Sequence, residues 1–135
     1  MDPSTVNWLA VIVSTIAFYV IGGLWYSPFL FGKIWMKEVN MKPEDAKKAN
    51  MAKIMPLTFL LSIVMVTNLA FFLNDPKIDA SSGAIYGFLT GFGWVSMAII
   101  LTALYEMKSW RYMLIHAGYM IVGFTLSGLI LGAWK

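Results

Sequence analysis

Residues 6–26 read VNWLAVIVSTIAFYVIGGLWY, a stretch that contains no charged side chain. About 20 consecutive apolar residues in a helix are enough to cross the hydrocarbon core of a bilayer. In lipid every backbone polar group needs a partner within the protein, and a helix supplies these partners. The stretch therefore predicts a membrane-spanning helix. No lysine or arginine precedes it, unlike the start of a secretory signal, so we expect this span to be retained.

Three further apolar stretches of similar length follow, at about residues 55–73, 82–105 and 110–134. The chain has 135 residues, of which 59% are hydrophobic and only 13% are charged. A soluble protein of this size could not bury so much apolar surface. The sequence thus predicts an all-α polytopic membrane protein, in which residues 1–135 form a single domain of four transmembrane helices.

The basic residues gather in two of the connecting segments. Eight of the ten lie between the first two spans or in the turn between the last two: Lys33, Lys37, Lys42, Lys47, Lys48, Lys53, Lys108 and Arg111. The opposite side holds only Lys77 and Lys135. Because basic loops stay in the cytoplasm, we expect the 27–54 loop to be cytoplasmic and both termini to lie outside the plasma (inner) membrane.

The residues after the first span predict a short helix along the membrane surface. Trp25 and Tyr26 fall where the first span ends, at the interfacial level that aromatic rings favour. Ser27 suits an N-cap, and Pro28 suits the first position of a new helix. From there the apolar side chains share one face and the lysines another, as in an interfacial amphipathic helix: Leu30, Phe31, Ile34 and Trp35 against Lys33 and Lys37.

Small residues recur at intervals of four in the last two spans. The third span carries Gly83, Gly87 and Gly91, and the fourth carries Gly128 and Gly132. This spacing lets a second helix approach closely. The stripe of the third span is compatible with packing within one subunit, with contact between subunits, or with the lining of a pore.

Polar and aromatic residues define a candidate site near the cytoplasmic ends of the spans, namely Trp25, Tyr26, Glu106, Arg111, His116 and Tyr119. We expect Glu106 either to pair with Lys108 or Arg111 or to form a proton or cation site. For His116 we expect a neutral ring bonded to a tyrosine or a backbone carbonyl, or a role in proton relay or ligand binding. A single histidine in a chain without cysteine is a poor metal or haem ligand unless subunits share the site.

Motifs of enzymes are missing from the sequence. It contains no GxSxG, HExxH, P-loop or dinucleotide fingerprint. The absence of cysteine excludes disulfides and thiolate metal sites. We therefore predict no catalytic residue, no cofactor and no metal. The lysine-rich loop also carries Glu38, Glu44 and Asp45, and nothing in it supports nucleic-acid binding.

Several motifs together resemble a known family. They are Asn7-Trp8, Trp25-Tyr26-Ser27-Pro28, Phe31-Gly32-Lys33-Ile34-Trp35, the stretch EDAKKANMAK, Tyr105-Glu106, His116-Ala117-Gly118-Tyr119 and Gly132-Ala133-Trp134. The chain is similar over nearly its whole length to small bacterial and fungal membrane proteins catalogued as domain of unknown function 1761. The resemblance implies a membrane fold and no activity. Position 116, where the resemblance leads us to expect asparagine, departs from the pattern, which argues against an essential acid–base role for His116.

Two functions remain open from the sequence. The first is a non-enzymatic, self-associating membrane protein that binds or passes a small solute or ion, since four spans alone enclose little volume. The second is an accessory or assembly subunit of a larger membrane complex, which suits a small chain with abundant small-residue faces. The expected partners are the lipid bilayer and either further copies of the chain or a larger membrane complex.

Overall fold

The computed structural model describes residues 2–135, and within that range it contains helices and no strand. Three of the long helices are α1 (Trp8–Trp25), α4 (Met51–Phe72) and α7 (Trp110–Ala133). The fourth is continuous from Ala80 to Tyr105 and comprises α5 (Ala80–Thr90), a π-helical segment η2 (Gly91–Ser96) and α6 (Met97–Tyr105). All four are long and apolar enough to cross a membrane, which confirms the fold class predicted from the sequence.

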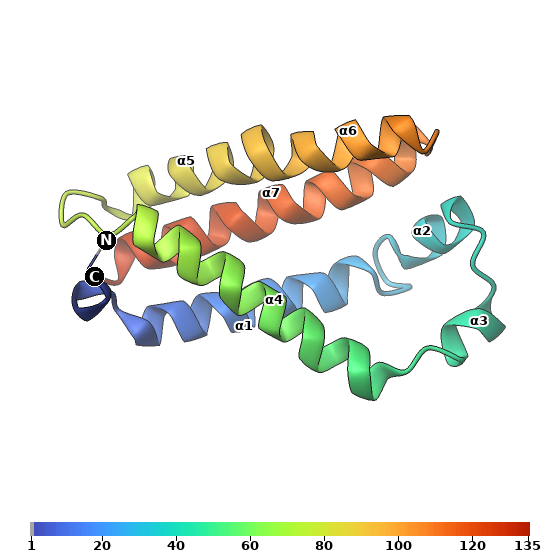
Figure 1. Ribbon diagram of the computed structural model, residues 1–135, viewed down its shortest axis with the longest axis horizontal. Helices are drawn as coiled ribbons and strands as arrows, with labels where there is room; N and C mark the ends of the chain where they lie inside the picture. Colours follow the sequence, from blue (N-terminus) through green and yellow to red (C-terminus); the bar gives the residue numbers. More distant parts are fainter. Residues whose placement is uncertain (1) are drawn as a thin grey trace.

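The long helices form a bundle, and the axis of α4 is inclined to the axes of the others. Figure 1 shows α5 and α6 running beside α7, with α1 on the other side of α7 and α4 crossing at an angle. Both termini and the α4–α5 loop lie at one end, here called the terminal end. The short helices η1 (Pro3–Thr5), α2 (Gly32–Glu38) and α3 (Pro43–Lys47) lie in the remaining segments. The end that carries α2 is called the α2 end.

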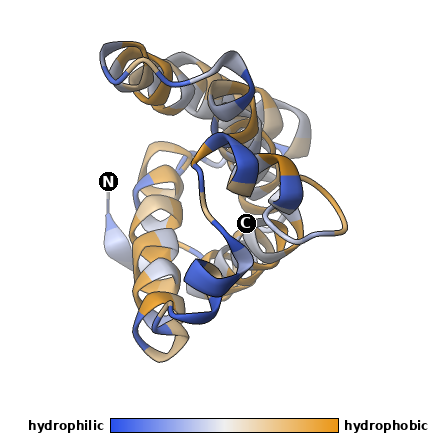
Figure 2. Ribbon diagram, turned by 90° about the vertical axis from the view of Figure 1, so that its right-hand side faces the viewer, coloured by the Kyte–Doolittle hydropathy of each residue, from blue (hydrophilic) through white to orange (hydrophobic). Residues whose placement is uncertain are grey.

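The core sits where α1, α4 and α7 meet. Phe18 of α1 is fully buried, and its ring packs edge-to-face on Tyr119 and on Phe124, with ring centroids 5.3 and 5.4 Å apart. Most other large apolar side chains of the long helices remain exposed, as expected where lipid covers them. Figure 2 shows apolar residues along these helices and hydrophilic residues concentrated in the connecting segments.

Hydrogen bonds tie the terminal end together. The side-chain amide of Asn7 donates to the carbonyl of Trp134 at 3.1 Å. The amide of Asn74 donates to the hydroxyl of Thr5 at 2.6 Å, and the Lys135 ammonium donates to the carbonyl of Leu73. These contacts hold the ends of α1, α4 and α7 close to one another, although α4 diverges from α5 further along.

The segment after α1 differs from the prediction in detail. The sequence predicts a helix that starts near Pro28 with Ser27 as its N-cap, but α2 begins only at Gly32. The Ser27 hydroxyl donates back to the carbonyl of Leu24, and the Ser27 carbonyl accepts the N–H of Gly32, so Ser27 closes a turn instead. A helix is thus present near the predicted place. Its position along a membrane surface stays a prediction. The side of the membrane on which each loop lies also stays a prediction.

Candidate functional site

The glycines of the third and fourth spans lie against each other within the chain. A side chain on Gly83 would overlap the carbonyl oxygen of Gly128, and one on Gly87 would overlap the carbonyl of Phe124. Gly132 meets the backbone of Asp79 in the same way. Gly91 approaches α7 less closely, with 2.8 Å between its hypothetical Cβ and the carbonyl oxygen of Met120. These glycines therefore let α5 and α7 approach to backbone contact.

An aromatic cluster joins the end of α1 to the first half of α7. The indole N–H of Trp25 donates to the carbonyl of Ile115 at 2.8 Å. The hydroxyl of Tyr26 and Nδ1 of His116 share a hydrogen bond of 2.6 Å. The ring of Tyr119 packs edge-to-face on Tyr26, with centroids 5.5 Å apart. Four of the six candidate residues therefore come together.

His116 is enclosed as well as hydrogen-bonded. The ring of Tyr112 packs edge-to-face on it, with centroids 4.3 Å apart. The buried Nε2 atom has no hydrogen-bond partner among residues 2–135, whereas Nδ1 is bonded to Tyr26. Because a buried charge without a partner is costly, this geometry suits a neutral imidazole that anchors α1 to α7. Within the same residues, no group of three or more His, Asp or Glu side chains could hold a metal ion.

The two remaining candidates, Glu106 and Arg111, do not join this cluster. The ion pair expected between Glu106 and Lys108 or Arg111 is wrong, because it does not form within residues 2–135. Glu106 is exposed at the C-terminal cap of α6 and forms no ion pair within residues 2–135. Arg111 pairs instead with Glu38, at 3.6 Å between the guanidinium and carboxylate. The reason is long-range, since α2 folds back against α7 and places Glu38 beside the first turn of α7.

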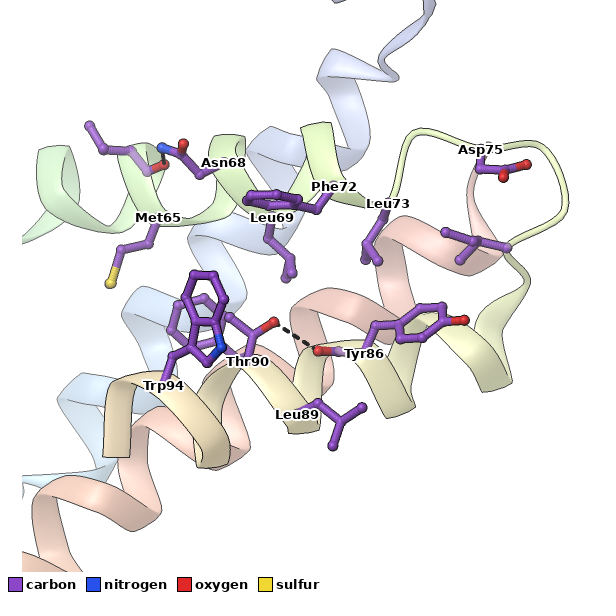
Figure 3. A pocket seen from close by; sticks show the side chains of 13 residues that line it. Met65, Asn68, Leu69, Phe72, Leu73, Asp75, Tyr86, Leu89, Thr90 and Trp94 are labelled. Carbon is purple, nitrogen blue, oxygen red and sulfur yellow. Dashed lines mark hydrogen bonds between the residues drawn. The ribbon is translucent and has the colours of Figure 1, made fainter. Parts of the chain in front are cut away.

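A groove between α4 and α5 is a feature that sequence reasoning missed. Its volume is about 740 Å³, and its walls are mostly apolar: Val64, Met65, Asn68, Leu69, Phe72, Leu73, Asp75, Ile78, Tyr86, Leu89, Thr90, Trp94 and Phe124. Figure 3 shows Leu69 of α4 and Trp94 of the third span extending toward each other across it. We call this space the α4–α5 groove.

The π-helical segment η2 carries Trp94 into the α4–α5 groove. A π-helical turn is rare, and such turns occur frequently at functional sites. The Ser96 hydroxyl of η2 donates to the carbonyl of Ala117 at 3.0 Å, which fixes the segment against α7. Two sequence signals could have indicated the groove. Asn68 and Trp94 are polar or interfacial residues placed well inside long apolar runs.

Comparisons with known proteins identify a family but no activity. Residues 9–132 match the family described as "Protein of unknown function (DUF1761)". This match covers most of the chain, and the chain therefore belongs to that family. No curated protein and no solved structure matches it.

Proposed function

We propose that this member of the DUF1761 family is a non-enzymatic membrane protein that binds a small lipid-soluble solute in the α4–α5 groove and works as a homo-oligomer. The observation that carries the proposal is the groove itself. Its volume of about 740 Å³ lies in the range of sites that enclose small molecules.

The position of the groove favours a solute that arrives through the bilayer. Phe72, Leu89 and Trp94 line it and are 62%, 52% and 74% exposed, so the groove opens to the outside of the bundle. On helices that cross a membrane, this outside faces lipid. Asp75 is the only charged residue of the wall, and it lies in the loop at the terminal end. An ion would find few ligands there, and we therefore favour a solute over an ion.

The exposed half of α4 supports self-association. Every residue from 51 to 61 is exposed, while the glycine faces of α5 and α7 are already occupied by each other. We propose that a second copy packs against this half of α4. Because the chain has no cysteine, a Leu57→Cys variant reports the contact by disulfide formation between copies in native membranes. A matched Leu114→Cys variant on the exposed face of α7 should form no disulfide between copies. Equal cross-linking of both variants would contradict the assignment of α4.

A second candidate function is an accessory subunit of a larger membrane complex. The same exposed half of α4 favours it, because a different membrane protein could pack there. For either function, we retain the proposal that the termini face outward from the plasma membrane and that the basic 27–54 loop is cytoplasmic.

Native mass spectrometry of the protein, extracted at natural expression level with its lipids, tests the proposal. A discrete homo-oligomer that carries a reproducible small bound mass is the expected result. A one-to-one assembly with a larger membrane protein would support the accessory-subunit function instead. A homo-oligomer or monomer without bound mass would contradict solute binding.

A further inference from the structure

Trp94 occupies an unusual depth for a tryptophan. It lies near the middle of the third span, about 21 Å from Ala80 and about 16 Å from Tyr105 along the helix. Tryptophan in membrane proteins favours the ends of spans, where its N–H reaches water and headgroups. Trp94 lies far from both ends of its span, and its side chain, which lines the α4–α5 groove, is 74% exposed.

The indole N–H of Trp94 forms no hydrogen bond within residues 2–135. The indoles of Trp8 and Trp25, by contrast, donate to the carbonyls of Pro3 and Ile115 at 3.1 and 2.8 Å. Lipid chains offer no acceptor at the depth of Trp94, and an unpaired donor in an apolar medium is unfavourable. The groove therefore presents a free hydrogen-bond donor to whatever fills it.

Two polar neighbours in the wall, Thr90 and Asn68, use a donor locally, whereas the hydroxyl of Tyr86, nearer the terminal end of the wall, has no hydrogen-bond partner within residues 2–135. The Thr90 hydroxyl donates to the carbonyl of Tyr86, and the Asn68 amide donates to the carbonyl of Val64, each at 2.9 Å. Within the membrane-spanning part of the wall no side chain carries a formal charge. A charged molecule would thus lose its hydration without gaining a counter-charge there.

We infer that the α4–α5 groove takes an uncharged, lipid-soluble molecule with a carbonyl oxygen that accepts a hydrogen bond from the Trp94 indole. The inference rests on the proposed function and adds the chemical class of the solute. The apolar body of the molecule lies against Leu69, Phe72 and Leu89. Long-chain ketones and quinones with an apolar tail share this chemistry.

The test compares probes that differ in the carbonyl group. We would measure apparent dissociation constants of 2-pentadecanone, pentadecane and decylubiquinone for the detergent-solubilised protein by native mass spectrometry. The wild type should bind 2-pentadecanone about tenfold more tightly than pentadecane, the order of effect of one hydrogen bond in an apolar site. If decylubiquinone binds more tightly than 2-pentadecanone, the natural ligand is a quinone. If 2-pentadecanone binds more tightly, the natural ligand is a simple carbonyl lipid.

Two variants separate the hydrogen bond from the groove. Trp94→Phe keeps an aromatic ring but removes the N–H, and should bind 2-pentadecanone and pentadecane equally. Trp110→Phe, at an exposed tryptophan outside the groove, should keep the wild-type preference. Circular dichroism and the unfolding midpoint establish that both variants are folded.

A third variant keeps the two proposals distinguishable. Leu89→Trp fills the groove with a bulky ring and should weaken the binding of all three probes. If Leu89→Trp does so while Trp94→Phe retains the preference for the ketone, the inference is overturned and the proposed function stands. A wild type that does not distinguish ketone from hydrocarbon also overturns the inference. If Leu89→Trp binds every probe like the wild type, the groove is not the site and both proposals fail.

Discussion

The carbonyl oxygen of Gly128 occupies the place where a side chain on Gly83 would begin. Gly87 stands in the same relation to the carbonyl of Phe124, one turn further along the pair of helices. Backbone contact of this kind maximises van der Waals packing between helices in lipid, where apolar side chains gain little from leaving one apolar medium for another. The α5–α7 pair is therefore packed to backbone contact, and α4 diverges from this pair to leave the groove.

Enlarging one of these glycines should destabilise the protein. Gly87→Ala puts a methyl group onto the Phe124 carbonyl and should cost about 1–3 kcal/mol, because the obstacle is backbone that cannot move aside cheaply. The unfolding midpoint in a denaturing detergent measures the loss. Gly93→Ala is the matched control, since nothing lies within 4 Å of its hypothetical Cβ in the same span. Equal destabilisation by both variants would contradict the packing account.

The Tyr26–His116 hydrogen bond should contribute to folding rather than to chemistry. Tyr26→Phe leaves Nδ1 of His116 without its partner and should destabilise the protein by about 1–3 kcal/mol. The unfolding midpoint in a denaturing detergent again measures the loss of stability. Tyr105→Phe, at a tyrosine that is 86% exposed, should lie within about 0.5 kcal/mol of the wild type. An unchanged midpoint for Tyr26→Phe would show that the hydrogen bond does not join α1 to α7 in solution.

The cap at the start of α5 predicts a dependence of stability on pH. The backbone N–H and the hydroxyl of Ser82 donate to Asp79, and these hydrogen bonds hold the pKa of that carboxyl below its usual value of 3.8. Because the folded state has the lower pKa, the stabilisation is present above the unfolded value and is lost as the pH falls through the folded value. Asp79→Asn keeps an oxygen acceptor but does not titrate.

The unfolding midpoint of the wild type should accordingly fall more steeply than that of Asp79→Asn below about pH 4. The two proteins are compared in the same detergent at a series of pH values. Parallel curves over this range would contradict the assignment of the cap.

The Arg111–Glu38 ion pair should contribute little to stability. Its charged atoms are 3.6 Å apart, and more than half of the Arg111 side chain is exposed. A double-mutant cycle of Arg111→Gln and Glu38→Gln should give a coupling of less than about 1 kcal/mol that weakens with salt. Glu106→Gln, which removes an exposed carboxylate without an ion pair in the described chain, should show no coupling to Arg111. Strong coupling of Glu106 to Arg111 would restore the pairing expected from the sequence.

The four spans were predictable because each is an apolar run long enough to determine its own structure. The ends were less predictable: α4 begins at Met51 rather than near residue 55, although Lys53 interrupts the apolar run there. The sequence favours a tyrosine or a carbonyl as a partner of His116, but the choice of Tyr26 depends on how α1 and α7 align. Such alignment is a property of the packed bundle and has no local signal.

The shape of the groove was unpredictable for the same reason. Its walls come from α4 and from the third span, and its width depends on the angle at which α4 crosses the bundle. The π-helical segment that carries Trp94 is a change of register within a helix, and hydrophobic periodicity in an almost wholly apolar span cannot indicate it. Only the placement of Trp94 and Asn68 within apolar runs was visible in the sequence.

The measurement that tests the central claim most directly is the small mass bound to the wild type, to Leu89→Trp and to Leu101→Trp after extraction with native lipids. Leu89 lines the groove and Leu101 lies outside it in the same span, and their exposed fractions are nearly equal, at 52% and 56%. Native mass spectrometry should find the bound mass on the wild type and on Leu101→Trp, and should not find it on Leu89→Trp. The same bound mass on all three proteins would contradict the account.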